Sequence, residues 1–417
     1  MAAPVTNLTR RGVLTLGAAG LLLPRFGLAD AVNGNRRRFL FIHCSGGWDT
    51  TTCFQPNFGS SVVEMEADAT ESEVGGITFV DHAGRPNVRA YFERYAPQTC
   101  VINGIEVQSI THERCHRIMM TGSAEGETDD WGAILAGKST ERHLLPYLVH
   151  SGTAFSAAHS QGVVRVGSAG QLSRLLDGKV LTEAEGQYPL PSPARAAQVD
   201  AFVRARMAAA APKSPIASAA TLALSDAESL ALYAGELEIT NTGGGCYQLT
   251  KNISSVWDVF AEGLARTALV KYAGWCSEGW DTHTRNERQA LHFDELFQAL
   301  GLALDDLATR PAIGGGSLAD ETVIVVLSEM GRTPRLTSIG GRDHWTFTSA
   351  MVVGAGVRGG QVVGGYDSSG FGAGCDFNSG EVSASGPGIL AANFGATVLA
   401  LGDVDPGEVA PIGAVVG

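Results

Sequence analysis

The sequence lacks a surplus of positive charge. Its 417 residues include 30 lysines and arginines against 43 aspartates and glutamates, so the formal net charge is −13. Proteins hold phosphate backbones through a surplus of lysine and arginine. The short basic run at residues 36–38 does not offset the deficit, and we predict no nucleic-acid partner.

Closely spaced cysteine pairs are also missing. The seven cysteines are scattered along the chain, and none has the Cys-x-x-Cys spacing. An odd number leaves at least one thiol unpaired if disulfides form in an oxidising compartment. The sequence does not give the pairing.

The start of the chain has no apolar run long enough to span a bilayer comfortably. Residues 13–23 form a short one, which follows paired arginines in "TRRGVL" and precedes a small-x-small cleavage pattern, "ADA", at residues 29–31. These features predict a twin-arginine export signal over residues 1–31 and no stable membrane anchor. The Tat translocase would then be a partner during export, and the mature protein would be periplasmic or secreted. The alternative is a disordered tail.

What is present is enough apolar sequence for a large core, since 44% of the residues are hydrophobic. Apolar runs alternate with helical patterns such as residues 287–308, which predicts an α/β domain over residues 37–417 with a mainly parallel sheet and helices on both faces. An alanine-rich stretch predicts a helical insertion at about residues 172–237. Polar clusters follow the expected strands at residues 39–43, 101–105, 269–276 and 323–327. Ligand groups collect at such strand ends.

Two motifs contain aspartate and histidine together. In "GWDTH", Asp281 and His283 are two apart, so in extended chain both side chains can converge on one ion. In "GRDHW", His344 precedes an expected strand and is a candidate third ligand. The alternatives are that Asp281 caps the next helix while His283 lies at a rim, and that His344 is a turn residue.

Two further motifs carry candidate chemistry. In "SEMGRT", Glu329 could bind a metal and Arg332 a phosphate or sulfate ester, or the two could form an ion pair. "THERCHRIMMTG" holds His112, Cys115 and His116 at a helix start, which suits a nucleophile or a metal site. Its letters also satisfy His-Glu-x-x-His, so a zinc peptidase with Glu113 as general base is an alternative.

One glycine pattern matches a dinucleotide-binding motif without its structural context. "GAGVRGG" from residue 354 matches G-x-G-x-x-G, but a strand-like run follows it where a dinucleotide site needs a helix. Without a helix N-terminus there is no cradle for a pyrophosphate. We interpret the segment as a β-hairpin turn and predict no dinucleotide.

The ordered motifs "GGWDTT", "HERCHRIMMTG", "GWDTH", "SEMGRT", "RDHW" and "GVRGGQVVGG" resemble the bacterial family called domain of unknown function 1501. That family is placed in the alkaline-phosphatase-like superfamily with the sulfatases and phosphoglycerate mutases. The resemblance covers the mature chain. It implies two neighbouring divalent metals, a nucleophile at a helix start, and cleavage of phosphate or sulfate esters.

By matching motifs, the resemblance implies that Asp281, His283 and His344 bind one metal, with Asp49 and Glu329 near a second. The sequence departs from the superfamily at Met330, where a histidine ligand is expected. That departure weakens the second site.

His112 stands at the nucleophile's position, and the sulfatase signature Cys-x-Pro-Ser-Arg is missing from the sequence. Thr111, Cys115 or water activated by the metal could attack instead. The resemblance thus predicts an exported hydrolase that uses a divalent metal (Zn, Mn, Mg or Ca). Its substrate would be a small anionic ester or a sulfated or phosphorylated glycan. The main alternative is a non-catalytic periplasmic binding protein that kept the fold.

Overall fold

The computed structural model describes residues 34–166, 192–210, 214–233, 237 and 246–417. The predicted export signal lies outside these residues. Among the described residues, no helix has the length and apolar character needed to cross a membrane.

One large sheet organises the chain. In its described part nine strands run in the order β12-β4-β11-β8-β1-β7-β5-β6, with β13 beside β4. Every neighbouring pair is parallel except the two that involve β11. The predicted mainly parallel sheet is therefore confirmed. The strands are β1 (Arg38–Cys44), β4 (Thr99–Glu106), β5 (Tyr147–Val149), β6 (Val163–Arg165), β7 (Thr267–Tyr272), β8 (Thr322–Ser328), β11 (Phe347–Gly354), β12 (Gln361–Gly364) and β13 (Ile389–Leu390).

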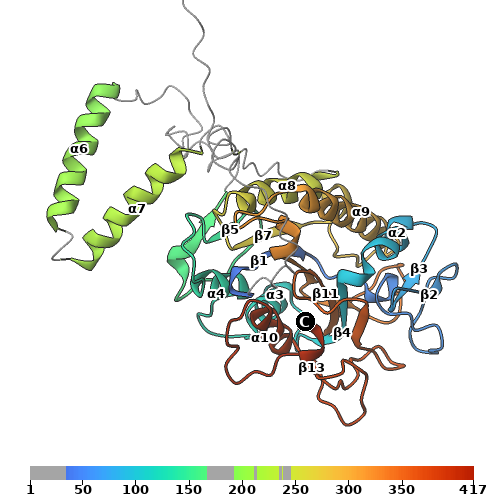
Figure 1. Ribbon diagram of the computed structural model, residues 1–417. Coiled ribbons are helices and arrows are strands. Elements are labelled where there is room, and N and C mark those ends of the chain that lie inside the picture. Colours follow the sequence, from blue (N-terminus) through green and yellow to red (C-terminus); the bar gives the residue numbers. More distant parts are fainter. Residues whose placement is uncertain (1–33, 167–191, 211–213, 234–236, 238–245) are drawn as a thin grey trace, which may run out of the picture. The chain divides into compact units, whose positions relative to one another are not determined.

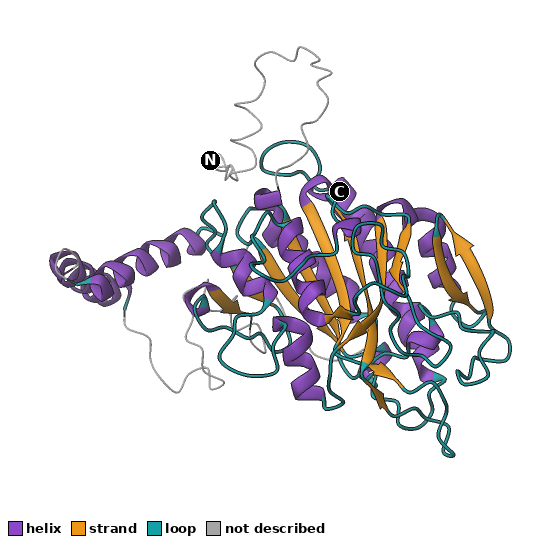
Figure 2. Cartoon of the chain, turned by 90° about the horizontal axis from the view of Figure 1, so that it is seen from below, coloured by secondary structure: helices purple, strands orange, loops and turns teal. Residues whose placement is uncertain are grey.

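Helices cover both faces of this sheet (Figure 1), as the sequence predicted. Alternate residues of β1 point to opposite faces, so Leu40 and Ile42 pack in one apolar cluster and Phe39 and Phe41 in the other. The first cluster includes α2 (Pro86–Tyr95), α8 (Gln248–Ala261) and α9 (Arg288–Thr309). The second includes α3 (His112–Thr121), α4 (Trp131–Gly137) and α10 (Ala391–Leu401). Figure 2 shows the strands between these helices.

Smaller elements complete the described chain. β2 (Thr70–Val74) and β3 (Ile77–Asp81) form an antiparallel pair, as do β9 (Gly331–Arg332) and β10 (His344–Trp345). Within the range of the expected insertion, α6 (Pro193–Ala210) pairs with α7 (Pro215–Ala231) through Arg204 and Glu228. An ion pair between Arg142 and Asp226 joins α7 to the rest of the domain.

The predicted hairpin at residue 354 is wrong. β11 and β12 lie on opposite sides of β4, and β12 pairs with β4 in parallel. The glycine-rich connection therefore crosses over a neighbouring strand. Sequence adjacency favoured a hairpin, but an apolar run can pair with any strand that exposes an edge, and β4 supplied that edge.

The sheet brings distant loops to one edge. Because β1, β4, β7 and β8 run in the same direction, the loops that follow them meet beyond their carboxyl ends. β11 runs antiparallel, so the segment that precedes it reaches the same edge. This reversal places His344, just before β11, beside the loops that carry Asp281 and Glu329.

Candidate functional site

Two glycines let the loops at this edge approach closely. A β-carbon on Gly46 would come within 2.7 Å of the Asp281 nitrogen, and one on Gly341 within 1.8 Å of the His283 carbonyl oxygen. Only glycine, which has no side chain, fits such contacts. The repeated Gly-Trp-Asp turns thus lie against each other. Their tryptophans, Trp48 and Trp280, pack edge to face with ring centroids 6.2 Å apart.

Three histidines converge on the carboxylate of Asp281. Its Oδ2 lies 3.3 Å from Nε2 of His112, and its Oδ1 lies 3.2 Å from Nε2 of both His283 and His344. Donor atoms of His112, Asp281 and His344 all lie within 4.8 Å of one another, the one group of this kind in the described residues. The Asp281 side chain is 44% exposed, so a ligand can reach the cluster from solvent.

Each imidazole is held at its other nitrogen. Nδ1 of His112 is 2.9 Å from Oε1 of Glu329, Nδ1 of His283 is 2.9 Å from Oδ1 of Asp343, and Nδ1 of His344 is 2.6 Å from the carbonyl of Ile110. A carbonyl can only accept, so Nδ1 of His344 carries the proton. Nε2 of the same ring faces Oδ1 of Asp281 at 3.2 Å.

Glu329 lies on the buried side of the histidine-aspartate cluster and is not one of its grouped donors. It is 2% exposed, and it accepts from the Gly46 amide at 2.8 Å and contacts Nε2 of His43 at 3.0 Å, in addition to His112. Burial opposes its ionisation, but the hydrogen bonds from His112 and His43 lower the pKa of Glu329 well below its usual value. The bond to Glu329 in turn raises the pKa of His112.

Arg332 forms its hydrogen bonds with oxygen atoms of the protein itself. It is 1% exposed, donates to the carbonyls of Gly47 at 2.9 Å and Arg342 at 3.1 Å, and contacts Oδ1 of Asp281 at 2.5 Å. Burial acts to raise the pKa of Asp281, yet the Arg332 hydrogen bond and charge hold that pKa below its usual value. Glu329 and Arg332, weighed as a mutual ion pair, instead each bind a different partner.

Asp49 lies apart from the histidines. One oxygen accepts from the amide and hydroxyl of Thr51, at 3.0 and 2.7 Å. The other accepts from Asn286 and lies 3.0 Å from Arg342. The side chain is 1% exposed and caps the 3-10 helix Thr50–Thr52. These contacts occupy both oxygens, and Asp49 is not in the group around Asp281.

The residues of the motif "THERCHRIMMTG" lie partly at the surface and partly in the core. Cys115 is fully buried, and burial raises the pKa of its thiol to about 11. Thr111 is exposed at the start of α3. His116 stacks on His43 with ring centroids 4.1 Å apart, and burial lowers its pKa to about 3. Because His112 meets Asp281 while His116 stacks on His43, the two do not form the paired site that a zinc peptidase requires.

Sequence reasoning placed no role on His43, Asp343 or Arg342, which hold Glu329, His283 and Asp49 respectively. Asp343 and Arg342 lie inside the quoted motif "GRDHW", and His43 is the penultimate residue of β1. A polar residue at the end of a buried strand was the signal that could have found His43.

The fold and site define an α/β protein with a histidine-aspartate cluster at the carboxyl edge of its sheet. The family model described as "Protein of unknown function (DUF1501)" matches residues 262–380. This is the family that the sequence motifs resemble, and the matched segment includes Asp281, His283, Glu329 and His344. A comparison with curated proteins found no match.

Several solved structures are similar to the chain. One, solved in complex with a neocarrahexaose, has 10% identity and a TM-score of 0.39, and the match covers 88% of this chain and 72% of that chain. A Bacteroides thetaiotaomicron protein of glycosaminoglycan metabolism has 9% identity and a TM-score of 0.38, with coverage of 89% and 74%. The phosphonate monoester hydrolase of Agrobacterium radiobacter has 12% identity and a TM-score of 0.35, with coverage of 88% and 74%.

Proposed function

We propose that the chain is an exported, divalent-metal-dependent hydrolase of phosphate or sulfate esters. The observation that carries this proposal is the convergence of three imidazole Nε2 atoms on the Asp281 carboxylate. His112, Asp281 and His344 are the proposed metal ligands, and His283 is a fourth side chain at the same place. This assignment moves His112 from the nucleophile's role to that of a ligand.

The donor set fits a cation. Nε2 of His283 and Nε2 of His344 are only 3.0 Å apart, and both rings are anchored through Nδ1 to oxygen acceptors. Imidazole nitrogens and a carboxylate oxygen that face one another are the donor atoms that a divalent cation binds. Histidines anchored by a carboxylate or carbonyl at the far nitrogen are the usual arrangement around a metal. Imidazoles with one carboxylate favour Zn²⁺ or Mn²⁺ over Mg²⁺ or Ca²⁺.

When bound, such an ion supplies Lewis-acid chemistry for ester cleavage. The chain's own residues position the reacting groups. Glu329 orients His112, and Arg332 fixes Asp281 and contributes positive charge beneath it. In this proposal Arg332 does not contact the ester, because its guanidinium is buried against carbonyls. The Asp281 side chain is 44% exposed, so an anionic ester can reach the cluster from solvent.

The attacking group in this proposal is water. Cys115 is buried with a raised pKa, so little thiolate exists at neutral pH. The hydroxyl of Thr111 is 3.5 Å from that of Ser109, and no described contact joins it to a base. The same observations favour the second candidate, a metal-dependent binding protein without turnover.

The test uses the full chain exported by its own signal. We expect stoichiometric divalent metal by mass spectrometry, and loss of metal and of ester turnover in His112→Ala and His344→Ala. His82→Ala is the matched control, since His82 bonds only locally to Gly84 in the described structure. The panel contains nitrophenyl phosphate, phosphodiester and sulfate. Metal-free wild-type protein would refute the proposal, and bound metal with no turnover would favour the binding protein.

A further inference from the structure

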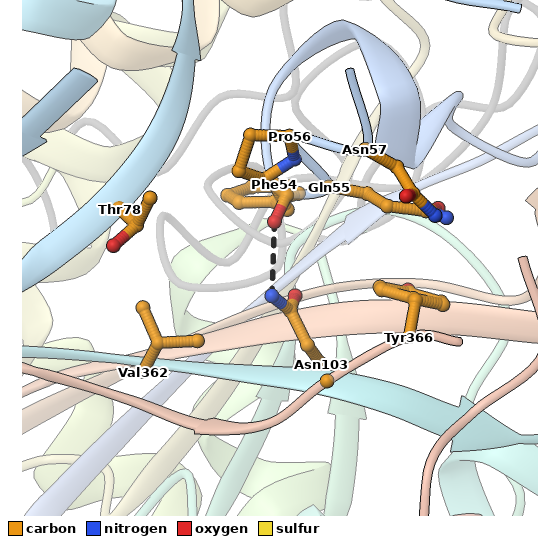
Figure 3. Close-up of a pocket in the computed structure, with 9 residues that line it drawn as sticks. Phe54, Gln55, Pro56, Asn57, Thr78, Asn103, Val362 and Tyr366 are labelled. Carbon is orange, nitrogen blue, oxygen red and sulfur yellow. Dashed lines mark hydrogen bonds between the residues drawn. The ribbon is translucent and has the colours of Figure 1, made fainter. Parts of the chain in front are cut away.

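Figure 3 shows a cavity in which Thr78 of β3, Asn103 of β4 and Val362 of β12 face residues 54–57. Its volume is about 200 Å³, and its lining includes no aspartate, glutamate, lysine or arginine. An anionic ester would lose its hydration there without a counter-charge. The cavity therefore does not suit the proposed substrate, which leaves the rim of the histidine-aspartate cluster to recognise the alcohol part of the ester.

A large apolar side chain, that of Ile110, lies exposed between two of the proposed metal ligands. The Ile110 carbonyl accepts from Nδ1 of His344 at 2.6 Å, and His112 follows Ile110 by two residues. Thr111 between them has an extended backbone, with φ −111° and ψ 133°. In extended chain, residues i and i+2 point to the same side, so the Ile110 side chain lies on the side of His112. It is 57% exposed, and a ligand bound at His112 would therefore meet it.

The loop that carries Ile110 is held in one conformation. The Val107 amide donates to the Thr346 carbonyl at 2.8 Å, and the Thr111 amide donates to the Ser109 hydroxyl at 3.4 Å. Gln108 has a left-handed backbone, with a φ of 51°. In a residue other than glycine such a backbone costs free energy, and it persists only where the surrounding structure enforces it. The exposure of the Ile110 side chain is thus a fixed feature of the folded loop.

A second exposed isoleucine, Ile339, lies in the loop that packs against the His283 backbone. Its side chain is 65% exposed. The Gly340 carbonyl accepts from the Asn286 amide at 2.9 Å, and a β-carbon on Gly341 would come within 1.8 Å of the His283 carbonyl oxygen. Exposed apolar surface beside a binding site gains free energy when a ligand removes it from water. The two isoleucines offer such surface to the alcohol part of an ester.

We propose that the alcohol part of the substrate is apolar, an alkyl or aryl group that packs on Ile110, with Ile339 as a second contact. This inference rests on the proposed function and narrows its substrate class from any anionic ester to an amphiphilic one. A sugar would present hydroxyl groups to the same isoleucine surface, and these hydroxyls would lose hydration without gaining hydrogen bonds from it.

Hexyl phosphate and glucose 6-phosphate test the proposal, because both are six-carbon primary esters that differ in their hydroxyl groups. Hexyl sulfate and glucose 6-sulfate form the corresponding sulfate pair. For the exported full chain we expect kcat/KM to be roughly tenfold higher for the hexyl ester than for the glucose ester. Ile110→Ser should remove most of this preference, whereas Ile110→Val, which keeps an apolar surface, should retain it. Ile313→Ser is the matched control, since Ile313 is 64% exposed in the loop that precedes β8.

A binding measurement on the same proteins needs no turnover. Calorimetry compares hexylphosphonate with methylphosphonate, which share the anionic group and differ in the alkyl chain. Wild type and Ile313→Ser should bind hexylphosphonate roughly tenfold more tightly than methylphosphonate, and Ile110→Ser should bind the two about equally. Metal content by mass spectrometry establishes that each variant keeps the proposed metal site.

A preference for the glucose esters would overturn the proposal, as would a hexyl preference that is unchanged in Ile110→Ser. Absence of binding by both phosphonates would overturn it as well. Metal content and turnover judge the proposed function, whereas selectivity between the paired ligands judges the apolar contact. Selective phosphonate binding without turnover would thus contradict the hydrolase and support the contact with Ile110.

Discussion

Glu329 supports the candidate site from a buried position, outside the group formed by His112, Asp281 and His344. It anchors His112 from beneath and is in turn held by His43 and the Gly46 amide. A carboxylate behind a metal-binding imidazole fixes the ring and raises its basicity. In the proposed metal site, the glutamate is therefore a positioning residue.

Glu329→Gln tests this role. The amide keeps the shape of the side chain but removes the charge that favours a proton on Nδ1 of His112. We expect metal affinity to fall by about 10–100-fold, the usual effect of losing such a partner. Competition with a chelator measures the affinity. Glu113→Gln is the control, because Glu113 is exposed on the same helix. Equal affinity in wild type and Glu329→Gln would contradict the positioning role.

Arg332 is expected to act through structure as well as charge. Arg332→Met leaves the carbonyls of Gly47 and Arg342 and the Asp281 carboxylate without their donor. Removing one partner of a buried charged network costs about 3–5 kcal/mol, so we expect a loss of stability of that order. Urea unfolding gives the value.

Arg335→Met provides the comparison, since Arg335 bonds to exposed carbonyls at Ser61 and Val62. If Arg332 is a buried structural residue, the loss of stability should be much larger in Arg332→Met than in Arg335→Met. If Arg332→Met kept full stability and lost only ester binding, the arginine would instead contact the substrate.

At the scale of elements, a buried carboxylate caps α4. Asp130 is fully buried, and it accepts from the amides of Ala133 and Phe155 at 2.8 and 2.9 Å. Burial, opposed by these bonds, raises its pKa to about 7. Between its unfolded pKa of about 4 and this value, the folded protein holds a proton that the unfolded chain releases.

The contribution of Asp130 to the unfolding free energy should therefore fall as pH rises from about 4 to about 7, and level off above that. The Asp130 contribution is on the order of 4 kcal/mol over the whole range. Asp130→Asn removes this contribution to the pH dependence of the unfolding free energy, and the asparagine can still cap the helix. Urea unfolding across this pH range compares the two. Identical slopes would show that Asp130 does not hold the proton.

The positions of the elements could be predicted from the sequence, whereas their long-range pairings could not. The strands β1, β4 and β8 and the helix α9 lie within a few residues of their expected ranges, because burial and periodicity are local signals. Pairing between distant residues is not local. Arg332 meets Asp281 across 51 positions, and His112 meets Glu329 across 217. The sequence therefore indicates candidate residues of the site, and only the fold gives their partners.

At the scale of the whole molecule, one disulfide ties the chain together near the site. Cys246, just before α8, bonds to Cys276 in the loop between β7 and Asp281. The bond closes a loop of 30 residues. Such a closure stabilises by roughly 3–4 kcal/mol in the chain-entropy model. The other five cysteines are buried and free.

The disulfide between Cys246 and Cys276 allows the predicted export to be tested chemically. Disulfides persist in oxidising compartments and are reduced in the cytosol. Of the seven cysteines, two are bonded, so exported protein unfolded in denaturant should titrate five thiols. Protein retained in the cytoplasm by replacing Arg10 and Arg11 with lysine should titrate seven. Exported protein should also unfold at lower urea once reduced, whereas Cys246→Ser/Cys276→Ser should not respond to reductant. Seven thiols in exported protein would contradict both the pairing and the oxidising compartment.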